Sequence, residues 1–295
     1  MACSFDYVRP RSLEELLAGL SEARAEGAVL AGGTDLHVKI RAGKACPRVL
    51  FDVSELASCR GIVLEERRLR IGAAVRMTEI AESNAVRAVA PSVVSAVMQM
   101  SSRQIRNRAT LGGNIVTASP AADAVPPLLA ADAAVALVGP EGKREVALSE
   151  FLLGPGKTGL GLAEVVAEVV VPVPARNRRS RFIKVGRRKA QAIAIVNLAG
   201  SIDLEDDGRV RDIRIVLGAV APTAMRAHRA EHALRGTRPS AENLREAAAL
   251  AAQECRPISD IRASAPGRRR LAEAWTLRML QSMIGEGNEG RGAEP

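Results

Sequence analysis

The amino-acid sequence predicts an α+β protein built from two parts that meet near residues 175–180. In the first part, short apolar runs typical of strands alternate with isolated helical patterns. In the second part, two long strand patterns precede three alanine-rich helical patterns. The length of 295 residues is enough for about two domains of ~150 residues. With 47% hydrophobic and 25% charged residues, the composition is that of an ordinary globular protein and excludes global disorder.

The first part opens with a helix signal. Ser12 and Glu15 have the spacing of a capping box, in which each side chain accepts a hydrogen bond from the other residue's amide. This helix is expected to end near Gly27, and residues 91–100 have the spacing of another helix. Residues 101–108 predict a polar, basic loop. Apolar and β-branched runs predict strands at residues 28–31, 49–53, 62–64, 69–74, 133–138, 145–148 and 165–173.

The second part follows a basic stretch, residues 176–189, which predicts a linker. Strands are expected at residues 192–204 and 210–220, joined by the hairpin signal Glu205-Asp206-Asp207-Gly208. The Gly- and Glu-rich residues 285–295 predict a disordered tail. Helices are expected at residues 223–234, 241–254 and 267–284.

The chain is strongly basic, with a formal charge of +9, which suggests a nucleic-acid binder. Proteins that bind single strands also need aromatic side chains on which bases stack. Only 2% of the residues are aromatic, and Phe182 is the one aromatic residue in the densest basic stretch. A solvated face or a docking surface for a partner is therefore favoured over a nucleic-acid site.

Neither the N-terminus nor the cysteines indicate export. No apolar run reaches the ~18 residues of a membrane span, and the N-terminus lacks the basic start and apolar stretch of a signal peptide. Cys3, Cys46, Cys59 and Cys255 are scattered without a C-x-x-C pair, so neither a disulfide framework nor a cysteine metal site is indicated. The sequence predicts a soluble, cytoplasmic protein with buried free thiols.

Two glycine pairs stand out, in Ala31-Gly32-Gly33-Thr34-Asp35 and in Thr110-Leu111-Gly112-Gly113-Asn114. A Gly-Gly turn has no Cβ atoms, so its backbone amides can approach an anion closely, and the neighbouring Thr34, Thr110 and Asn114 could add side-chain donors. Two such loops facing each other could enclose a pyrophosphate. The alternative interpretation is two ordinary tight turns, and the residues alone leave both open. The nicotinamide-type fingerprint G-x-G-x-x-G is absent.

Other motifs are discounted. Gly156-Lys157-Thr158 resembles the end of a P-loop, but Phe151 stands where its first glycine is needed. His228-Arg229-Ala230-Glu231-His232 fits the H-x-x-E-H zinc pattern, but a surface helix is the favoured interpretation. There is no G-x-S-x-G nucleophile motif. No side chain is therefore assigned a catalytic role or a metal, and a cofactor would carry any chemistry.

The glycine loops and their surroundings resemble the FAD-binding (medium) subunit of the xanthine dehydrogenase-type molybdenum hydroxylases, which include carbon monoxide dehydrogenase relatives. The resemblance extends from Phe5 to about residue 283. One departure is Ala265-Pro266-Gly267-Arg268, where the family commonly has an acidic residue and a tyrosine; the cysteine-rich insert of some relatives is also missing. The resemblance rests on an ordered set of motifs at residues 5–10, 31–36, 104–107, 110–115, 118–123, 182–184, 187–189 and 257–264.

This resemblance implies an FAD-binding domain of the PCMH/VAO-like type at residues 1–175, with subdomains at 1–55 and 60–175, and a smaller α+β domain at 180–284. Both glycine loops would line the FAD pyrophosphate and ribityl chain. Asp123 would hold a polar part of the dinucleotide, and Val166 and Lys184 would lie near the adenine or flavin. The implied FAD-binding residues are Val29, Leu30, Ala31, Gly32, Gly33, Thr34, Asp35, Leu36, Ala109, Thr110, Gly112, Gly113, Asn114, Val116, Asp123, Val166 and Lys184.

The resemblance also implies an activity and partners. Electrons from a molybdenum cofactor in a large subunit would pass through the 2Fe-2S clusters of a small subunit to the FAD of this chain. They would then pass to NAD+, oxygen or a quinone. The expected assembly is a dimer of heterotrimers. The alternative hypothesis is a basic adaptor or nucleic-acid-binding protein without flavin.

Overall fold

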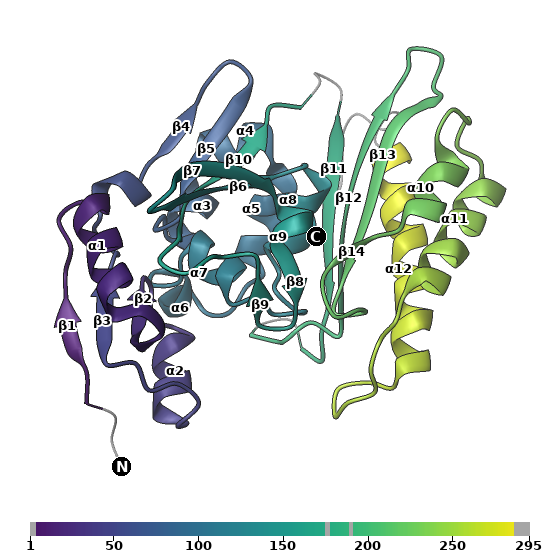
Figure 1. Ribbon diagram of the computed structural model, residues 1–295. Coiled ribbons are helices and arrows are strands. Elements are labelled where there is room, and N and C mark those ends of the chain that lie inside the picture. Colours follow the sequence, from purple (N-terminus) through teal and green to yellow (C-terminus); the bar gives the residue numbers. More distant parts are fainter. Residues whose placement is uncertain (1–3, 175–177, 189–190, 286–295) are drawn as a thin grey trace. The chain divides into compact units, whose positions relative to one another are not determined.

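The computed structural model describes residues 4–174, 178–188 and 191–285 (Figure 1). The chain forms two compact units. The first unit contains Met1–Val89, Met100–Ser119 and Asp132–Val173. The second unit contains Ala90–Gln99, Pro120–Ala131 and Pro174–Pro295, so two short segments from the first half of the chain belong to it.

The first unit begins with a small parallel sheet in the order β1-β3-β2. Helix α1 packs on it through Leu16 and Leu20, which share a core with Phe51. Ser12 Oγ accepts from Glu15 N (3.2 Å), which confirms the predicted start of α1, while Glu15 accepts from Arg11 N. The elements are β1 Asp6–Val8, α1 Leu13–Ala23, β2 Gly27–Leu30, α2 Leu36–Arg41 and β3 Val49–Asp52.

The rest of the first unit is built on a five-stranded antiparallel sheet in the order β4-β5-β10-β6-β7. The two predicted hairpins supply β4 with β5 and β6 with β7, and the apolar run at 165–173 becomes the central strand β10. The elements are β4 Ile62–Leu64, β5 Arg68–Gly72, α3 Met77–Glu82, α4 Asn84–Val89, α6 Arg103–Arg106, α7 Leu111–Val116, β6 Ala134–Gly139, β7 Gly142–Ala147, α9 Leu148–Phe151, β8 Leu152–Gly154, β9 Lys157–Thr158 and β10 Val165–Pro172.

The second unit is a four-stranded antiparallel sheet in the order β11-β12-β13-β14. Helices α10, α11 and α12 cover one face and bury a core that includes Leu198, Ile215 and Met279 (Figure 1). On the other face lies α8, whose last carbonyl, that of Ala130, accepts from Ser201 Oγ (2.9 Å). The elements are α5 Pro91–Met98, α8 Val125–Ala130, β11 Arg179–Val185, β12 Val196–Leu204, β13 Val210–Gly218, β14 Met225–Arg226, α10 His228–Leu234, α11 Ala241–Glu254 and α12 Ala265–Gly285.

Several local predictions are wrong. The expected linker contains β11, an edge strand whose basic side chains hide the strand pattern while its backbone pairs with β12. The expected loop 101–108 contains the single helical turn α6, capped by Ser102. The helix expected from residue 223 starts at His228, because Met225 and Arg226 pair with β13 instead.

The cysteine prediction is confirmed in part. Cys59 and Cys255 are buried and free. Cys46 is disulfide-bonded, so the prediction of a free thiol is wrong at this position, since sequence spacing does not show which cysteines meet. Cys3, residues 176–177, Lys189 and the predicted tail beyond Gly285 lie outside the described residues. Within the described ranges, no helix is both long and apolar enough to span a membrane.

Candidate functional site

A cavity of about 390 Å³ lies in the first unit and is lined by both glycine loops. Of the residues that the sequence assigned to a cofactor, Leu30, Asp123 and Lys184 do not line it. The assigned residues that do are Val29, Ala31, Gly32, Gly33, Thr34, Asp35, Leu36, Ala109, Thr110, Gly112, Gly113, Asn114, Val116 and Val166. The structure therefore brings together two segments that are about eighty residues apart in the chain.

The two loops are in direct contact through their backbones. A Cβ atom at Gly32 would lie 2.0 Å from the carbonyl oxygen of Arg108 and 2.9 Å from Cα of Ala109. A Cβ atom at Gly112 would lie 2.6 Å from Cβ of Ala73. These approaches are closer than any side chain permits, so glycine is required at both positions by packing.

The second glycine pair opens helix α7 and is not a tight turn. Thr110 is its N-cap and is buried. The four amides that open the helix all donate within the protein, at 2.9–3.2 Å: Leu111 N to Val75 O, Gly112 N to Ala73 O, Gly113 N to Thr110 Oγ1 and Asn114 N to Thr110 O. The second loop therefore forms a wall of the cavity, and its backbone amides are not available to an anion.

The first glycine pair has the opposite character. Among the described residues, no acceptor is found for the amides of Gly32, Gly33 or Thr34. Gly33 has φ +73°, a left-handed conformation that suits glycine, and its carbonyl accepts from His37 N at the start of α2. Residues that line the cavity thus carry backbone donors with no acceptor in the described part of the chain, an arrangement that suits a phosphate group.

Polar side chains that sequence reasoning missed add charge to the lining. Lys39 Nζ lies 2.7 Å from Asp35 Oδ2, one helical turn away, and both side chains are about half exposed. The i, i+4 spacing of Asp35 and Lys39 would have predicted this ion pair, but only if the helix beginning at Leu36 had been expected. Glu164 is held by Arg144, whose hydrogen bonds keep the pKa of Glu164 below its usual value. Asn114, which the sequence did assign, has its Oδ1 buried without a hydrogen-bond partner among the described residues.

The remaining lining is mostly apolar and mostly buried. Its apolar members are Leu16, Val53, Cys59, Ala73, Ala74, Leu160 and Val165, and Thr117, whose hydroxyl donates to Asp35 Oδ2 (3.4 Å), completes the lining. Burial, with a smaller contribution from the charge of Glu168, raises the pKa of the Cys59 thiol to about 11, so it is neutral at physiological pH. No motif marks these residues, because a core side chain and a cavity-lining side chain have the same sequence pattern.

Asp123 and Lys184 lie in the second unit and are bonded to each other. Lys184 Nζ is 2.6 Å from Asp123 Oδ2, and both side chains are buried. Asn197 Nδ2 donates to Asp123 Oδ1 (3.0 Å). Burial raises the pKa of Asp123, and the charge of Lys184 and the two hydrogen bonds oppose this shift without cancelling it. The assignment of Asp123, Lys184 and Leu30 to a cofactor stays a prediction.

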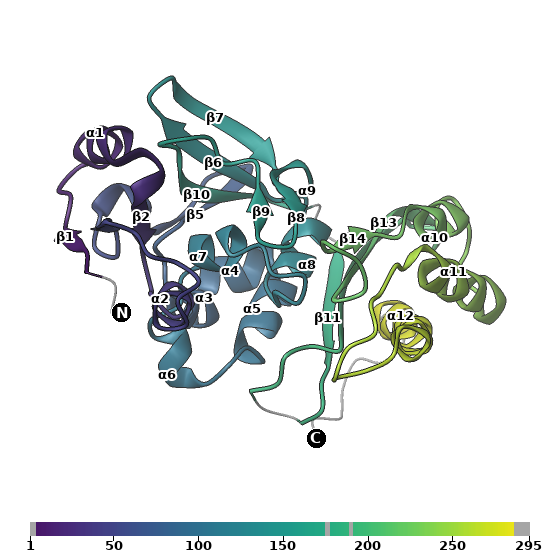
Figure 2. The ribbon, with the colours of Figure 1, turned by 60° about the horizontal axis from the view of Figure 1, so that its bottom comes forward.

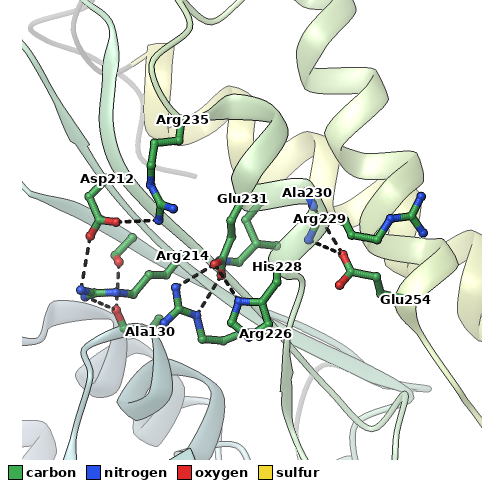
Figure 3. A network of polar contacts seen from close by, with 12 residues as sticks. Ala130, Asp212, Arg214, Arg226, His228, Arg229, Ala230, Glu231, Arg235 and Glu254 are labelled. Carbon is green, nitrogen blue, oxygen red and sulfur yellow. Dashed lines mark hydrogen bonds and ion pairs between the residues drawn. The ribbon is translucent and has the colours of Figure 1, made fainter.

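The discounted zinc pattern has a structural role (Figure 3). Glu231 is buried and accepts two hydrogen bonds from Arg226 (3.0 and 2.7 Å) and one from Ile215 N (2.9 Å). The side chain of His228 is 72% exposed. Within the described residues, no group of three or more His, Cys, Asp or Glu side chains is placed to hold a metal ion. The motif thus joins α10 to β13 and β14.

Comparison with known proteins defines the class. Residues 3–174 match the family described as the FAD binding domain in molybdopterin dehydrogenase, and residues 181–283 match the CO dehydrogenase flavoprotein C-terminal domain. The chain therefore belongs to the FAD-binding (medium) subunits of the xanthine dehydrogenase and carbon monoxide dehydrogenase-type molybdenum hydroxylases. This confirms the resemblance and the α+β fold that were inferred from the motifs.

Individual relatives agree along the chain. It is 31% identical over 280 residues to the xanthine dehydrogenase FAD-binding subunit of Escherichia coli O157:H7, covering 94% of this chain and 95% of the relative. It is 31% identical to the carbon monoxide dehydrogenase medium chain of Hydrogenophaga pseudoflava, covering 94% and 96%. The solved carbon monoxide dehydrogenase of that organism superposes with a TM-score of 0.92 at 32% identity, covering 96% and 98%.

Proposed function

We propose that this chain carries FAD in a molybdenum hydroxylase complex and passes electrons from the iron–sulfur clusters of a partner subunit to an acceptor. The observation that supports this proposal is a cavity lined by both α7 and the first glycine loop, in which the amides of Gly32, Gly33 and Thr34 have no acceptor among the described residues. Family membership identifies the dinucleotide whose diphosphate suits those donors.

The residues present fit FAD. The amides of the first loop would hold the pyrophosphate, and Lys39 would supply a positive charge, since its half-exposed pairing with Asp35 is worth only ~0–1 kcal/mol and is easily exchanged. Asn114 Oδ1, buried and unpaired, would accept from a hydroxyl of the ligand. The apolar lining would exclude water. Asp123 is proposed to hold a polar part of the cofactor, and Val166 and Lys184 are proposed to lie near its adenine or flavin. Bound FAD supplies the electron transfer itself.

Partners and acceptor belong to the same proposal. Relatives are named as medium chains or FAD-binding subunits of dehydrogenases. We infer a complex with a large molybdenum-cofactor subunit and a small 2Fe-2S subunit, arranged as a cytoplasmic dimer of heterotrimers. NAD+ is proposed as an acceptor, with oxygen or a quinone as alternatives, and a basic adaptor or nucleic-acid binder is not favoured.

Purification of the full chain tests the proposal. We expect flavin absorbance in the purified protein, or tight uptake of added FAD with quenching of flavin fluorescence. A chain that contains no flavin and takes up none would contradict the proposal. The FAD-loaded protein is then reduced anaerobically with dithionite and mixed with NAD+, a quinone or oxygen; the competent acceptor is the one that takes up the electrons and restores the absorbance of oxidised flavin.

A further inference from the structure

One side of the cavity in the first unit is lined by residues of a short loop. Residues 159–164, which we call the wall loop, connect β9 to β10, and two of them, Leu160 and Glu164, line the cavity. Leu162, between these two, is 68% exposed. The loop therefore has one part against the cavity and one part in solvent. Two of its residues are glycines, so ordering its backbone is costly in conformational entropy.

Few backbone hydrogen bonds hold the wall loop in place. At its start, Gly159 N donates to Phe151 O (2.8 Å). At its end, Glu164 N donates to Gly161 O (3.2 Å). Within the described chain, the amides of its two leucines and its alanine have no acceptor. That alanine, Ala163, has a left-handed backbone with φ +58°, which is unfavourable for a residue with a Cβ atom. The backbone alone therefore does not explain the shape of the loop.

The support comes from Arg144 on β7, an edge strand of the five-stranded sheet (Figure 2). Its Nε donates to Glu164 Oε1 (2.7 Å), and its Nη2 donates to Glu164 Oε2 (2.7 Å). The same Nη2 also donates to the carbonyl of Gly159 (2.9 Å). One guanidinium thus joins the first and the last residue of the wall loop, through the two-pronged geometry that makes arginine–carboxylate pairs strong.

The Glu164 carboxylate also holds the middle of the loop. Its Oε2 accepts from Gly161 N (2.6 Å). A Cβ atom at Gly161 would lie 2.8 Å from that oxygen, and one at Gly139 would lie 2.7 Å from Glu164 Cγ, so both glycines leave room for this side chain. The Glu164 side chain is 16% exposed, and the Arg144 side chain is 48% exposed, so water weakens their pairing only in part.

Arg144 is not needed to join β7 to the sheet, because every residue of β7 is in register with a residue of β6. Another ion pair of this sheet, Arg68 Nη1 with Glu145 Oε2 (3.2 Å), involves no residue of the cavity lining. Arg144 differs from it, because both of its acceptors belong to the wall loop. A loop that is ordered before a ligand arrives binds more tightly than one that must be ordered during binding.

We propose that Arg144 is a positioning residue, which holds the wall loop in its folded shape so that Leu160 and Glu164 meet bound FAD without a further cost of ordering. This rests on the proposed function, since the ligand is the FAD of that proposal. Arg144 does not line the cavity and acts through the loop. Its charge also offsets that of Glu164, which would otherwise repel the diphosphate of the dinucleotide.

The test compares FAD release from variants of the full chain. Arg144→Met keeps most of the side-chain stem and removes every donor of the guanidinium. We expect FAD to leave this variant about tenfold or more faster, with an association rate within about threefold of the wild type. Dissociation is measured from the rise of flavin fluorescence after dilution of the FAD-loaded protein. Arg68→Met, which removes the other ion pair of the sheet, is the matched control and should release FAD like the wild type.

Hydrogen exchange of peptides that cover the wall loop distinguishes positioning from general stability. Without FAD, the loop should exchange faster in Arg144→Met than in the wild type, while the rest of the first unit exchanges alike. FAD should then slow exchange of the loop more in the variant than in the wild type, because only the variant orders the loop on binding.

A second substitution tests the partner of Arg144. Glu164→Gln keeps the shape of the side chain and removes its charge, so it should also release FAD faster. The double variant should release FAD no faster than Arg144→Met alone, since both changes break one contact.

Wild-type release from Arg144→Met or from Glu164→Gln would overturn the inference while leaving the FAD proposal intact. Equal acceleration in Arg68→Met, or additive effects of the two substitutions in the double variant, would overturn it as well. A wild-type chain that binds no FAD would instead refute the proposed function, and this inference with it.

Discussion

The two glycine pairs look alike in the sequence and differ in the structure. At Gly32-Gly33 the amides have no acceptor among the residues that the structure describes, and the backbone takes a left-handed turn at Gly33. At Gly112-Gly113 the amides are used within helix α7, and glycine is needed because α7 packs against Ala73. One pair can donate to an anion and the other shapes the space that the anion enters.

This difference shows what a glycine pair can and cannot predict. It predicts that something approaches the backbone closely, because no Cβ is present. It does not say whether that neighbour is a ligand or the protein itself. The fate of the amides decides the question, and it depends on residues such as Val75 and Ala73 that are distant in the sequence.

The largest effect is expected where the two loops touch. In Gly32→Val, the new Cβ would collide with the carbonyl of Arg108, so the loops would have to separate. We expect loss of FAD binding together with roughly 3 kcal/mol of lost folding stability. Flavin content and urea denaturation measure the two effects. Unchanged stability would show that the contact between the loops is not tight and that packing does not require glycine at position 32.

A variant that fills the cavity from α7 without disturbing the fold tests the role of this helix independently of the amides in the first glycine loop. Gly113 is exposed and helical, and among the described residues a Cβ there would meet the side-chain oxygen Thr110 Oγ1 alone, at 2.9 Å, which a small shift of that hydroxyl relieves. Gly113→Val should therefore fold and weaken FAD binding by about 30-fold or more by filling space. Gly33 is a poorer choice, because its φ of +73° would strain any side chain.

The matched control is Gly154→Val, because Gly154 lies outside the cavity lining and no described residue comes within 4 Å of the position of its added Cβ. This control should bind FAD like the wild type. If Gly113→Val also binds FAD normally, with its affinity measured by fluorescence quenching, the assignment of α7 as a wall of the FAD cavity is wrong.

The sequence predicted best what local signals determine. Helix α11 was expected at 241–254 and is found at Ala241–Glu254, because Ser240 caps it and its apolar face has helical spacing. The hairpin between β12 and β13 was found through its turn residues. The glycine loops of the candidate site were found because close approach to the backbone requires glycine, and glycine pairs can be recognised in the sequence.

The rest depended on tertiary contacts. Strand β11 was hidden by its arginines, and the start of α7 looked like a turn until its amides were seen to be bonded. Lys39, Cys59 and Glu164 line the cavity but resemble ordinary surface or core residues in sequence. No sequence pattern indicated that α5 and α8 belong to the second unit.

A smaller effect is expected from the charge beside the donor loop. Lys39→Met removes a cation from the cavity and should weaken FAD binding by about fivefold, since a half-exposed ion pair is worth about 1 kcal/mol. Binding of riboflavin, which has no phosphate, should not change. Asp35→Asn removes the competing carboxylate and should have the opposite sign.

Lys44→Met is the matched control, because Lys44 is exposed near the end of α2 and does not line the cavity. Titrations at low and high salt should show that Lys39→Met has lost part of the salt dependence of FAD binding. Equal losses for FAD and riboflavin would mean that Lys39 acts on the shape of the cavity and not on the diphosphate.

The smallest effect on FAD affinity is expected from a change in the apolar lining of the cavity, at Cys59. Burial raises the pKa of Cys59 to about 11, from 9.0 for a thiol in water, so the folded state favours the neutral thiol. Its stabilising contribution is complete below about pH 9, where the unfolded chain begins to ionise, and is lost as the pH rises to about 11. Cys59→Ala should change FAD affinity at pH 7 less than about twofold, because only a small apolar contact is removed.

Cys255 is the control that distinguishes an effect of lining the cavity from an effect of burial alone. Its pKa is also raised by burial, to about 12, but it lies in the second unit and does not line the cavity. Urea denaturation between pH 9 and 11 should lose part of its pH dependence in either alanine variant. Bound FAD, in contrast, should slow alkylation of Cys59 and leave Cys255 unaffected, as followed by peptide mass spectrometry. Equal protection of both thiols would show that FAD stabilises the whole chain and would give no evidence that it covers the lining between the two glycine loops.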